Sequence, residues 1–284
     1  MDYIRLSPEN LESEHICCAI SNAKDPQVVA KKQWLAERLG ESLVFLKADA
    51  RGKCFIEYIP AENAWAPIDA PGYMFIDCLW VSGSFKGHGY SNDLLNECIR
   101  DSREKGKSGL CILSSAKKRG FLADPKYLKY KGFIKTDSAE PYFELMYLPF
   151  NPSAPAPRFR EQAKGAQTDG SGFEIFYTSQ CPFTTKYVPI IENIANNMNL
   201  PLSAVHISSR EQVQNAPCAY TAFSLFYNGK FITHEIPSEK KFAAICEEFV
   251  KKNTAGLTGS VKYTNIEKGK DICPPRRTKR RHYA

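Results

Sequence analysis

A chain of 284 residues with 43% hydrophobic and 24% charged residues has the composition of an ordinary globular protein, long enough for two modest domains. Its net charge of +7 resides mainly in the segment from Lys268 to Ala284, which holds seven basic residues and one acidic residue, so the rest of the chain is nearly neutral and forms no basic surface for nucleic acid. No apolar run approaches the roughly 18 residues that span a bilayer, and the first residues lack the basic and apolar regions of a secretory signal, so we expect a cytoplasmic protein without a membrane partner.

Residues 1–150 combine helical and strand-like patterns, and we expect them to form one domain. Apolar residues spaced three and four positions apart predict helices over residues 11–20, 28–39, 90–105 and 126–131. Runs of β-branched and aromatic residues predict strands over residues 43–47, 54–59, 73–81, 109–114, 133–136 and 142–148, with a proline-containing loop over residues 61–72. Strands that precede a β-α-β unit predict an α+β fold, in which helices flank a mixed, mostly antiparallel sheet.

A glycine-containing loop, Lys86-Gly87-His88-Gly89-Tyr90-Ser91, joins the strand that ends near Val81 to the helix that begins near Tyr90. Its glycines let the backbone approach a ligand closely, and the start of the helix offers unpaired N–H groups and a dipole that favours an anion. It is not a dinucleotide fingerprint, because Asn92 occupies the third glycine position, and it lacks the Gly-Lys-Ser/Thr ending of a Walker A loop. The loop alone fits two interpretations equally: a phosphate site, or a turn that uses glycine only for its geometry.

The residues around this loop resemble motif A of the GNAT acetyltransferase superfamily, which reads Arg/Gln-x-x-Gly-x-Gly/Ala after a strand and carries Leu-Leu on the next helix. Lys86 stands where the family has Arg or Gln, Ser91 stands where it has Gly or Ala, and Leu94-Leu95 follow on the helix. The segment Tyr127–Phe133 is similar to the place where these enzymes end their fourth helix in Gly-Phe.

The resemblance implies an N-acetyltransferase that moves the acetyl group of acetyl-CoA directly to an amine acceptor, on a small molecule or a peptide, within a ternary complex. Amides of the strand would bind the pantetheine arm and polarise the thioester carbonyl, at Leu79, Trp80 and Val81. The loop and the first turn of the helix would hold the pyrophosphate through Lys86, Gly87, His88, Gly89, Tyr90, Ser91 and Asn92.

Such a reaction requires one group that removes a proton from the attacking amine and another that protonates the departing thiolate. Glu57, on the strand before the motif, and Asp77, on the strand of the motif, are the candidate bases, although each also fits a solvent-facing strand position. The family often takes its acid from a tyrosine four residues before the late glycine, but Leu128 occupies that position here. Tyr127 is therefore the candidate acid, and we expect Tyr130 to serve in packing.

The acceptor side of these enzymes is bordered by the first helix and by the loop before the motif's strand. In this chain these segments hold Glu14, His15, Cys17 and Cys18, and Trp65 and Asp69. They are candidates for shaping the amine pocket, while His15 also fits an ordinary surface or core histidine.

Residues 151–172 mark a boundary, because three prolines alternate with small residues and a polar, glycine-containing stretch follows. We expect a linker there and a second domain over residues 173–253. In that domain the pattern predicts the order β-α-β-α-β-β-α, with Asn228-Gly229 as a hairpin turn and Ser238 as the cap of the last helix. This is the order of a thioredoxin-like α/β fold, and the two halves together resemble YoaP-type members of the superfamily, which join a GNAT domain to such a domain.

Cys181 stands at the start of the first helix of this second domain, as the active cysteine of thioredoxin-like folds does. A helix N-terminus lowers the pKa of a thiol and favours the thiolate. Dithiol chemistry needs a second cysteine, but Thr184 occupies its place, and Thr221 stands where the usual cis-proline would be. A role as an accessory thiol, with Cys218 as a more remote resolving partner, and a purely structural domain both fit this pattern.

Residues 254–284 predict a flexible basic tail that would bind an anionic partner weakly. The ten cysteines include no Cys-x-x-Cys pair and no metal-ligand spacing with histidine, so we expect reduced thiols and no bound metal. Two functions remain open beside acetyl transfer: a redox protein that uses Cys181, and a non-catalytic adaptor that senses acetyl-CoA. The acceptor amine and the oligomeric state do not follow from the sequence.

Overall fold

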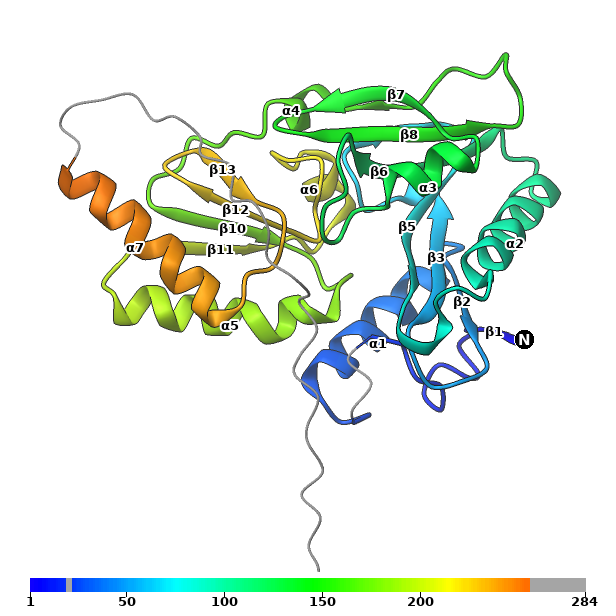
Figure 1. Ribbon diagram of the computed structural model, residues 1–284, viewed down its shortest axis with the longest axis horizontal. Helices are drawn as coiled ribbons and strands as arrows, with labels where there is room; N and C mark the ends of the chain where they lie inside the picture. Colours follow the sequence, from blue (N-terminus) through cyan, green and yellow to red (C-terminus); the bar gives the residue numbers. More distant parts are fainter. Residues whose placement is uncertain (19–21, 256–284) are drawn as a thin grey trace, which may run out of the picture. The chain divides into compact units, whose positions relative to one another are not determined.

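The computed structural model describes residues 1–18 and 22–255 (Figure 1). Residues Met1–Ala244 form one compact unit, and a second unit begins at Ile245 with the end of the last helix, α7 (Glu239–Ala255). The predicted basic tail lies, from residue 256 on, outside the described residues. Within the described ranges, no helix is both long and apolar enough to cross a membrane.

A seven-stranded sheet forms the centre of the first half, residues 1–150. Its strands are β1 (Tyr3–Arg5), β2 (Val44–Ala48), β3 (Cys54–Pro60), β5 (Tyr73–Val81), β6 (Gly109–Ser115), β7 (Ile134–Ala139) and β8 (Phe143–Pro149). They lie in the order β1-β2-β3-β5-β6-β8-β7. Only β5 and β6 pair in parallel and the other neighbours are antiparallel, which confirms the predicted mixed, mostly antiparallel sheet.

Three helices flank this sheet: α1 (Pro26–Leu39), α2 (Tyr90–Glu104) and α3 (Pro125–Tyr130). Asp25 and Asp124 cap α1 and α3, because each side chain accepts a hydrogen bond from the backbone N–H two residues on. A proline follows each cap at the first helical position, where its missing N–H costs nothing. The predicted starts of these helices are therefore correct to within two residues.

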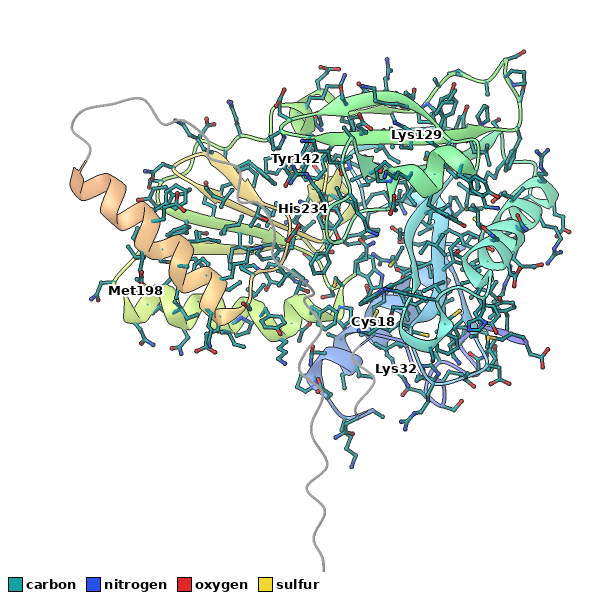
Figure 2. The ribbon with its side chains drawn as sticks, in the orientation of Figure 1. Cys18, Lys32, Lys129, Tyr142, Met198 and His234 are labelled. Carbon is teal, nitrogen blue, oxygen red and sulfur yellow. The ribbon has the colours of Figure 1, made fainter. Side chains whose placement is uncertain are left out.

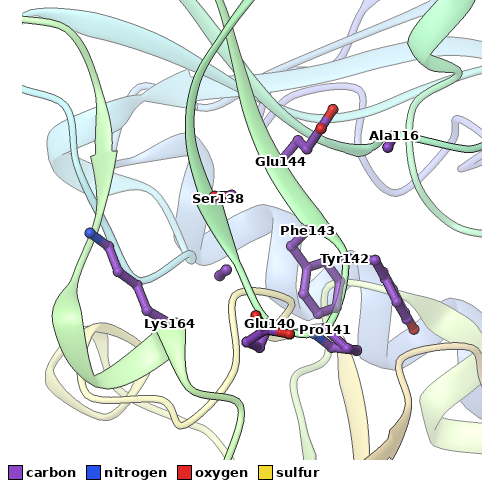
Figure 3. A pocket seen from close by; sticks show the side chains of 9 residues that line it. Ala116, Ser138, Glu140, Pro141, Tyr142, Phe143, Glu144 and Lys164 are labelled. Atoms are coloured by element: carbon purple, nitrogen blue, oxygen red, sulfur yellow. The ribbon is translucent and has the colours of Figure 1, made fainter. Parts of the chain in front are cut away.

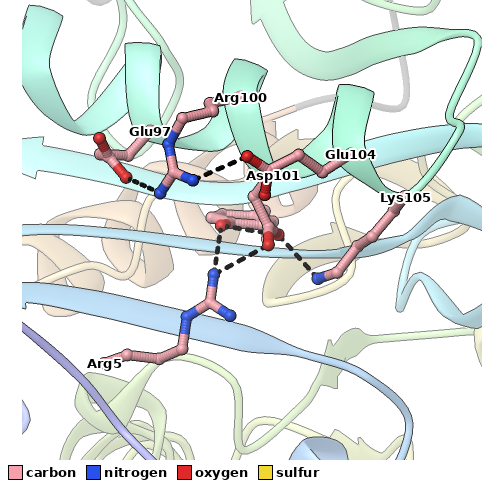
Figure 4. A network of polar contacts seen from close by, with 7 residues as sticks. Arg5, Glu97, Arg100, Asp101, Glu104 and Lys105 are labelled. Carbon is pink, nitrogen blue, oxygen red and sulfur yellow. Dashed lines mark hydrogen bonds and ion pairs between the residues drawn. The ribbon is translucent and has the colours of Figure 1, made fainter.

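Alternate side chains of β5 divide the core into two layers. Tyr73 and Phe75 join one apolar cluster with residues of α1, and Met74 and Ile76 join the other with residues of α2 and α3. Polar contacts also tie α2 to β1, since the Asp101 carboxylate accepts hydrogen bonds from Arg5 at 3.0 Å and Lys105 at 2.7 Å (Figure 4). The Arg5 contact therefore holds β1 against α2, the helix that follows the glycine loop.

The predicted helix over residues 11–20 is wrong over its described part. The chain forms turns up to Ser13, and Cys17 lies in the left-handed region with a φ of 63°. Leu11, Ile16 and Cys17 are nevertheless buried. Their apolar spacing thus reflects an irregular segment packed on the core, which a periodicity rule cannot distinguish from a helix face.

The segment predicted as a linker contains short structured elements. β9 (Arg158–Phe159) pairs with β4 (Ile68–Asp69) in the loop before β5, and the single turn α4 (Glu161–Lys164) follows. Phe159 is buried, and Arg158 binds the Asp69 carboxylate at 2.8 Å. The chain between the two halves is therefore fastened to the first half.

A four-stranded sheet forms the second half, which begins at residue 173. Its strands are β10 (Phe173–Tyr177), β11 (Leu202–His206), β12 (Phe223–Tyr227) and β13 (Lys230–Thr233). They lie in the order β11-β10-β12-β13, with β10 and β11 parallel and the other pairs antiparallel. With α5 (Pro182–Asn197), α6 (Arg210–Gln214) and α7, this confirms the predicted order of elements, while the thioredoxin-like assignment stays a prediction.

The hairpin turn between β12 and β13 follows the sequence signal closely. Asn228 and Gly229 have φ of 47° and 75°, and a type I′ turn requires positive φ at both positions.

Candidate active site

β5 and β6 separate halfway along β5. Their parallel ladder runs from Tyr73 opposite Gly109 to Ile76 opposite Ile112 and ends there, although β6 continues beside β8 as far as Ser115. A strand edge without a neighbour presents N–H and C=O groups that an extended, amide-containing ligand can pair with. Residues 77–81 present such an edge.

A β-bulge at Asp77 sets the direction of the side chains around it. In the ladder of β3 and β5, Glu57 lies opposite Cys78 and the register shifts immediately after, so Asp77 is the extra residue. The bulge changes the alternation, and Cys78 packs against the same apolar cluster as Phe75. The carboxyl groups of Glu57 and Asp77 are thereby brought close enough to interact.

Glu57 is held in a buried ion pair with Lys31 of α1. The Lys31 Nζ lies 2.7 and 2.8 Å from the two carboxylate oxygens, and the side chains of Lys31 and Glu57 are only 4% and 2% exposed. The alternative in which Glu57 faces solvent is therefore wrong. Both of its oxygens are committed to the ammonium group, which leaves little freedom for Glu57 itself to accept a substrate proton.

Asp77 lies beside this ion pair and has a different electrostatic environment. Burial, and then the negative charge of Glu57, raise the pKa of Asp77 well above its usual range, while Lys31 acts in the opposite direction. The side-chain amide of Gln180, from the second half, donates a hydrogen bond to Asp77 Oδ1 at 3.3 Å. A carboxylate with increased proton affinity is better matched to general-base catalysis than an ordinary aspartate.

The glycine loop lies directly before α2, as predicted. Gly87 and Gly89 have φ of 84° and 81°, and a Cβ built on either would meet no neighbouring heavy atom within 4 Å. Glycine is therefore needed here for its backbone conformation, and the space beside the loop is open. The Asn92 N–H donates to the Gly89 carbonyl at 2.8 Å, so this amide, expected to bind pyrophosphate, is already engaged within the helix.

A positively charged cavity of about 520 Å³ adjoins the start of α3. It is lined by Ala116, Lys117, Lys118, Asp124, Pro125 and Lys126. Tyr127, next in sequence, donates its hydroxyl proton to the Ser91 carbonyl at 2.8 Å and so ties the first turn of α3 to that of α2. Lys126, the neighbour of Tyr127 in sequence, thus lies close to this contact, and the lysines of the cavity add positive charge on the side of α3.

The candidate acid, Tyr127, is committed to this bond with Ser91, and burial raises its pKa. Leu128, at the position where the family places its acid, is buried in the core. Tyr130 is 80% exposed, so the expectation that it serves in packing is wrong: α3 ends at this residue and its ring points outward.

A second cavity, of about 440 Å³, lies along the hairpin of β7 and β8 (Figure 3). It is lined by Ala116, Ser138, Ala139, Glu140, Pro141, Tyr142, Phe143, Glu144 and Lys164. Ala116 lines both cavities, so the two adjoin each other. Sequence reasoning did not predict this cavity, because its walls come from both strands of the hairpin and from α4.

Polar contacts join the second half to the first, and Figure 2 labels two of the residues that make them, Tyr142 and His234. His234 is fully buried; its Nδ1 accepts the Tyr142 hydroxyl proton at 2.8 Å and its Nε2 lies 2.8 Å from the Gly120 carbonyl oxygen. Because a carbonyl can only accept, Nε2 carries a proton. Burial lowers the pKa of His234 to about 4, so the ring is neutral near pH 7 and Nδ1 is the acceptor. The Thr221 hydroxyl adds a further bond, to the Trp65 carbonyl.

Cys181 is the N-cap residue of α5, at the predicted place, and lies near Cys18 and Cys78 of the first half. The predicted lowering of its pKa is wrong. Burial raises the pKa of the Cys181 thiol to about 11 and outweighs the Phe183 N–H that favours the thiolate. Burial also raises the pKa of Cys218, the remote resolving candidate, to about 12.

The predicted acceptor-side residues before α1 are engaged in structural contacts. Both ring nitrogens of His15 have backbone partners, the Ala50 carbonyl at 2.9 Å and the Cys17 N–H at 3.2 Å. Glu14 forms an ion pair with the buried Lys47 at 2.9 Å. Their role is therefore to hold the irregular N-terminal segment on the sheet.

The sequence of this chain is similar to those of known proteins. A family model described as YoaP-like matches residues 201–243. The uncharacterized N-acetyltransferase YoaP of Bacillus subtilis (strain 168) is 40% identical over 243 residues, which cover 85% of this chain and 97% of that protein. The chain belongs to the YoaP-type GNAT acetyltransferases. This confirms the resemblance seen in the sequence, and the match, at 85% of the chain, includes residues of both halves.

Solved structures resemble part of this YoaP-type chain. One is a putative GNAT-family acetyltransferase from Desulfovibrio desulfuricans, which is 17% identical with a TM-score of 0.38. The match covers 52% of this chain and 98% of that chain. YncA from Salmonella typhimurium, solved with acetyl-CoA, has 12% identity, a TM-score of 0.39, and coverage of 55% and 97%.

Sequence reasoning missed two residues of this candidate site, Lys31 and Gln180. Lys31 had a signal, because it stands three residues after Val28 and three before Trp34, on the buried stripe of α1. A charged residue on such a stripe predicts a buried partner. Gln180 had none, since its partner Asp77 is 103 residues away in the sequence.

Proposed function

We propose that this protein transfers the acetyl group of acetyl-CoA to the amine of a small molecule or a peptide by direct attack within a ternary complex. The observation that carries the proposal is the combination of two features along one stretch of chain: the free edge of β5 after Ile76, and the glycine loop with open space before α2. Acetyl-CoA has the matching chemistry, an extended arm with two amide groups followed by a pyrophosphate.

The residues present fit this co-substrate. Leu79 and Val81 offer strand amides to the arm, whereas the alternation of the ladder points the backbone groups of Trp80 toward β3. The loop offers the Lys86 charge and the amides of residues 87–91 to the pyrophosphate at a helix N-terminus. Lysines of the adjoining cavity add positive charge. When bound, acetyl-CoA supplies an acetyl group already activated as a thioester.

We assign the general base to Asp77 rather than to Glu57. An attacking amine must be neutral, and the Asp77 carboxylate, with its raised pKa, would accept its proton. Glu57 has both oxygens bound by Lys31, and it contributes through its charge, which strengthens the proton affinity of Asp77. Tyr127 would have to release the Ser91 carbonyl before it could protonate the thiolate.

The binding step is tested by calorimetry with acetyl-CoA. Gly87→Asp and Gly89→Asp place a carboxylate where the pyrophosphate would lie, and we expect both to abolish binding. Gly106→Asp is the matched control, because Gly106 follows the opposite end of α2, has a φ of 67° and also faces open space. Binding that survives in the two loop variants would contradict the proposal.

The chemical step is tested with a panel of amines, following CoA release and the mass of the product. Asp77→Asn should keep acetyl-CoA binding and lower kcat by about 10²- to 10⁴-fold, the usual contribution of a positioned base. Acetyl-CoA binding without turnover of any amine would favour the sensing adaptor. A redox role for Cys181 is not favoured, because its raised pKa leaves almost no thiolate near neutral pH. Cytoplasmic location and an anionic partner for the tail stay predictions.

A further inference from the structure

We propose that Gln180, contributed by the second half of the chain, is a positioning residue of the acetyl-transfer site: its side-chain amide holds the Asp77 carboxylate in one orientation beside the free edge of β5. This inference rests on the proposed acetyl transfer. It gives the second half a defined part in the reaction, because the residue that aligns the base comes from there.

The turn that presents Gln180 is held rigidly by Thr184. The buried Thr184 hydroxyl lies within hydrogen-bond distance of two carbonyl oxygens, those of Thr178 at 2.9 Å and Cys181 at 2.7 Å, and the Gln180 N–H donates to the Thr178 hydroxyl at 3.4 Å. Thr178 and Thr184 are both fully buried. Thus the threonine that stands in place of a second redox cysteine fixes the turn from which Gln180 reaches Asp77.

The charges around Asp77 make this amide important. The groups that interact with the carboxyl come from α1, β3, β5, β6 and the turn before α5: Lys31, Glu57, Cys78, Cys111 and Gln180. Lys31 and Glu57 are bound to each other, and burial raises the pKa of both thiols, which keeps them neutral. The Gln180 N–H is therefore a donor aimed at Asp77 itself. With Oδ1 held, Oδ2 is the oxygen that can take the amine proton.

A direct titration of Asp77 tests the proposal without any substrate. The full-length protein carries ¹³C in the aspartate carboxyl groups, and the Asp77 signal is identified by its loss in Asp77→Asn. A donor to a carboxylate stabilises the charged form, so Gln180→Ala should raise the Asp77 pKa by about 1, a modest value for a hydrogen bond to a charged group. Gln180→Lys should lower it, because the ammonium favours the carboxylate.

Ser179→Ala is the matched control. It alters the preceding residue of the same turn, whose hydroxyl contacts His206 and not Asp77, and should leave the Asp77 pKa unchanged. An unchanged Asp77 pKa in Gln180→Ala would overturn the assignment. So would a pKa that moves in the same direction in the Ala and Lys variants, because a general loosening of the turn would not shift it in opposite directions.

The same variants are then compared in turnover, with the best amine of the panel. The acid limb of the kcat/KM profile should move with the Asp77 pKa, so an increase of about 1 in that pKa should cost Gln180→Ala about tenfold in kcat/KM below the limb. A wild-type profile in Gln180→Ala would refute this inference alone. A wild-type protein that neither binds acetyl-CoA nor acetylates any amine would instead refute the proposed function. The titration would still show whether Gln180 holds the Asp77 carboxylate.

Discussion

Acidification should weaken this protein in part through the neutral imidazole of His234. The ring bridges the Tyr142 hydroxyl of the β7–β8 turn and the Gly120 carbonyl of the loop after β6, and it has no exposed surface. Protonation would place a proton on Nδ1, which now accepts the Tyr142 hydroxyl. The positive charges of Arg119 and Lys241 also lower the pKa of His234, whereas the negative charge of Glu235 raises it.

The size of the effect follows from the difference in pKa between the folded and unfolded states. His234 has a pKa of about 4 in the folded protein, against its ordinary value of 6.5. Because the unfolded chain takes up the proton first, this contribution to stability is complete above pH 6.5 and is lost as the pH falls toward 4. Linkage gives a loss of about 3 kcal/mol between pH 7 and pH 4, roughly two-thirds of it by pH 5.

The measurement is urea unfolding of the wild type and of His234→Gln across this pH range. Glutamine does not titrate and keeps an N–H donor for the Gly120 carbonyl, and the difference between the two proteins removes the contribution of the carboxylates. The free energy of unfolding of the wild type should fall by about 3 kcal/mol more than that of the variant. Parallel pH profiles would show that His234 is protonated in the folded state or that its site opens before unfolding.

Two further predictions concern the buried groups near the site. Lys31→Met leaves the Glu57 carboxylate buried without a partner and should lower the free energy of unfolding in urea by about 3–5 kcal/mol. The double variant with Glu57→Gln should recover most of that loss. Equal losses in the two variants would show that the pair is not buried in solution. Cys181 alkylation should reach half its maximal rate near pH 11 in the folded protein, as its raised pKa requires, and near the ordinary thiol value in urea; a midpoint below pH 8 when folded would restore the redox hypothesis.

The elements that could be predicted are those with local signals. β5 (Tyr73–Val81) coincides with its predicted range, because an apolar run bounded by turn residues determines both of its ends. α1 begins after Asp25 as a capped, proline-started helix. The strand β9 was missed because it has only two residues and is stabilised by pairing with β4, far away in the sequence.

The site was predictable only where its chemistry resides in the backbone. The glycine loop could be found because φ near 80° at Gly87 and Gly89 is a local demand on residue type. The electrostatic state of Asp77 could not, because it depends on a bulge that turns its side chain beside Glu57 and on an ammonium group from α1. For Cys181 the expectation that a helix N-terminus lowers the thiol pKa was wrong in direction. The helix dipole stabilises a thiolate by less than burial destabilises it.

Two residues of the second half, Thr184 and Thr221, differ from the pattern of a thioredoxin-like redox site. Thr221 contacts the first half directly, and Thr184 supports the contact made by Gln180. Thr184, in place of a second cysteine, holds the turn from which Gln180 reaches Asp77. Thr221, in place of a cis-proline, bonds the Trp65 carbonyl. A dithiol pair would require an accessible thiolate at this same surface, but burial raises the pKa of Cys181 and so disfavours one. The surface that would serve redox chemistry in an isolated domain is therefore used here to complete the site around Asp77.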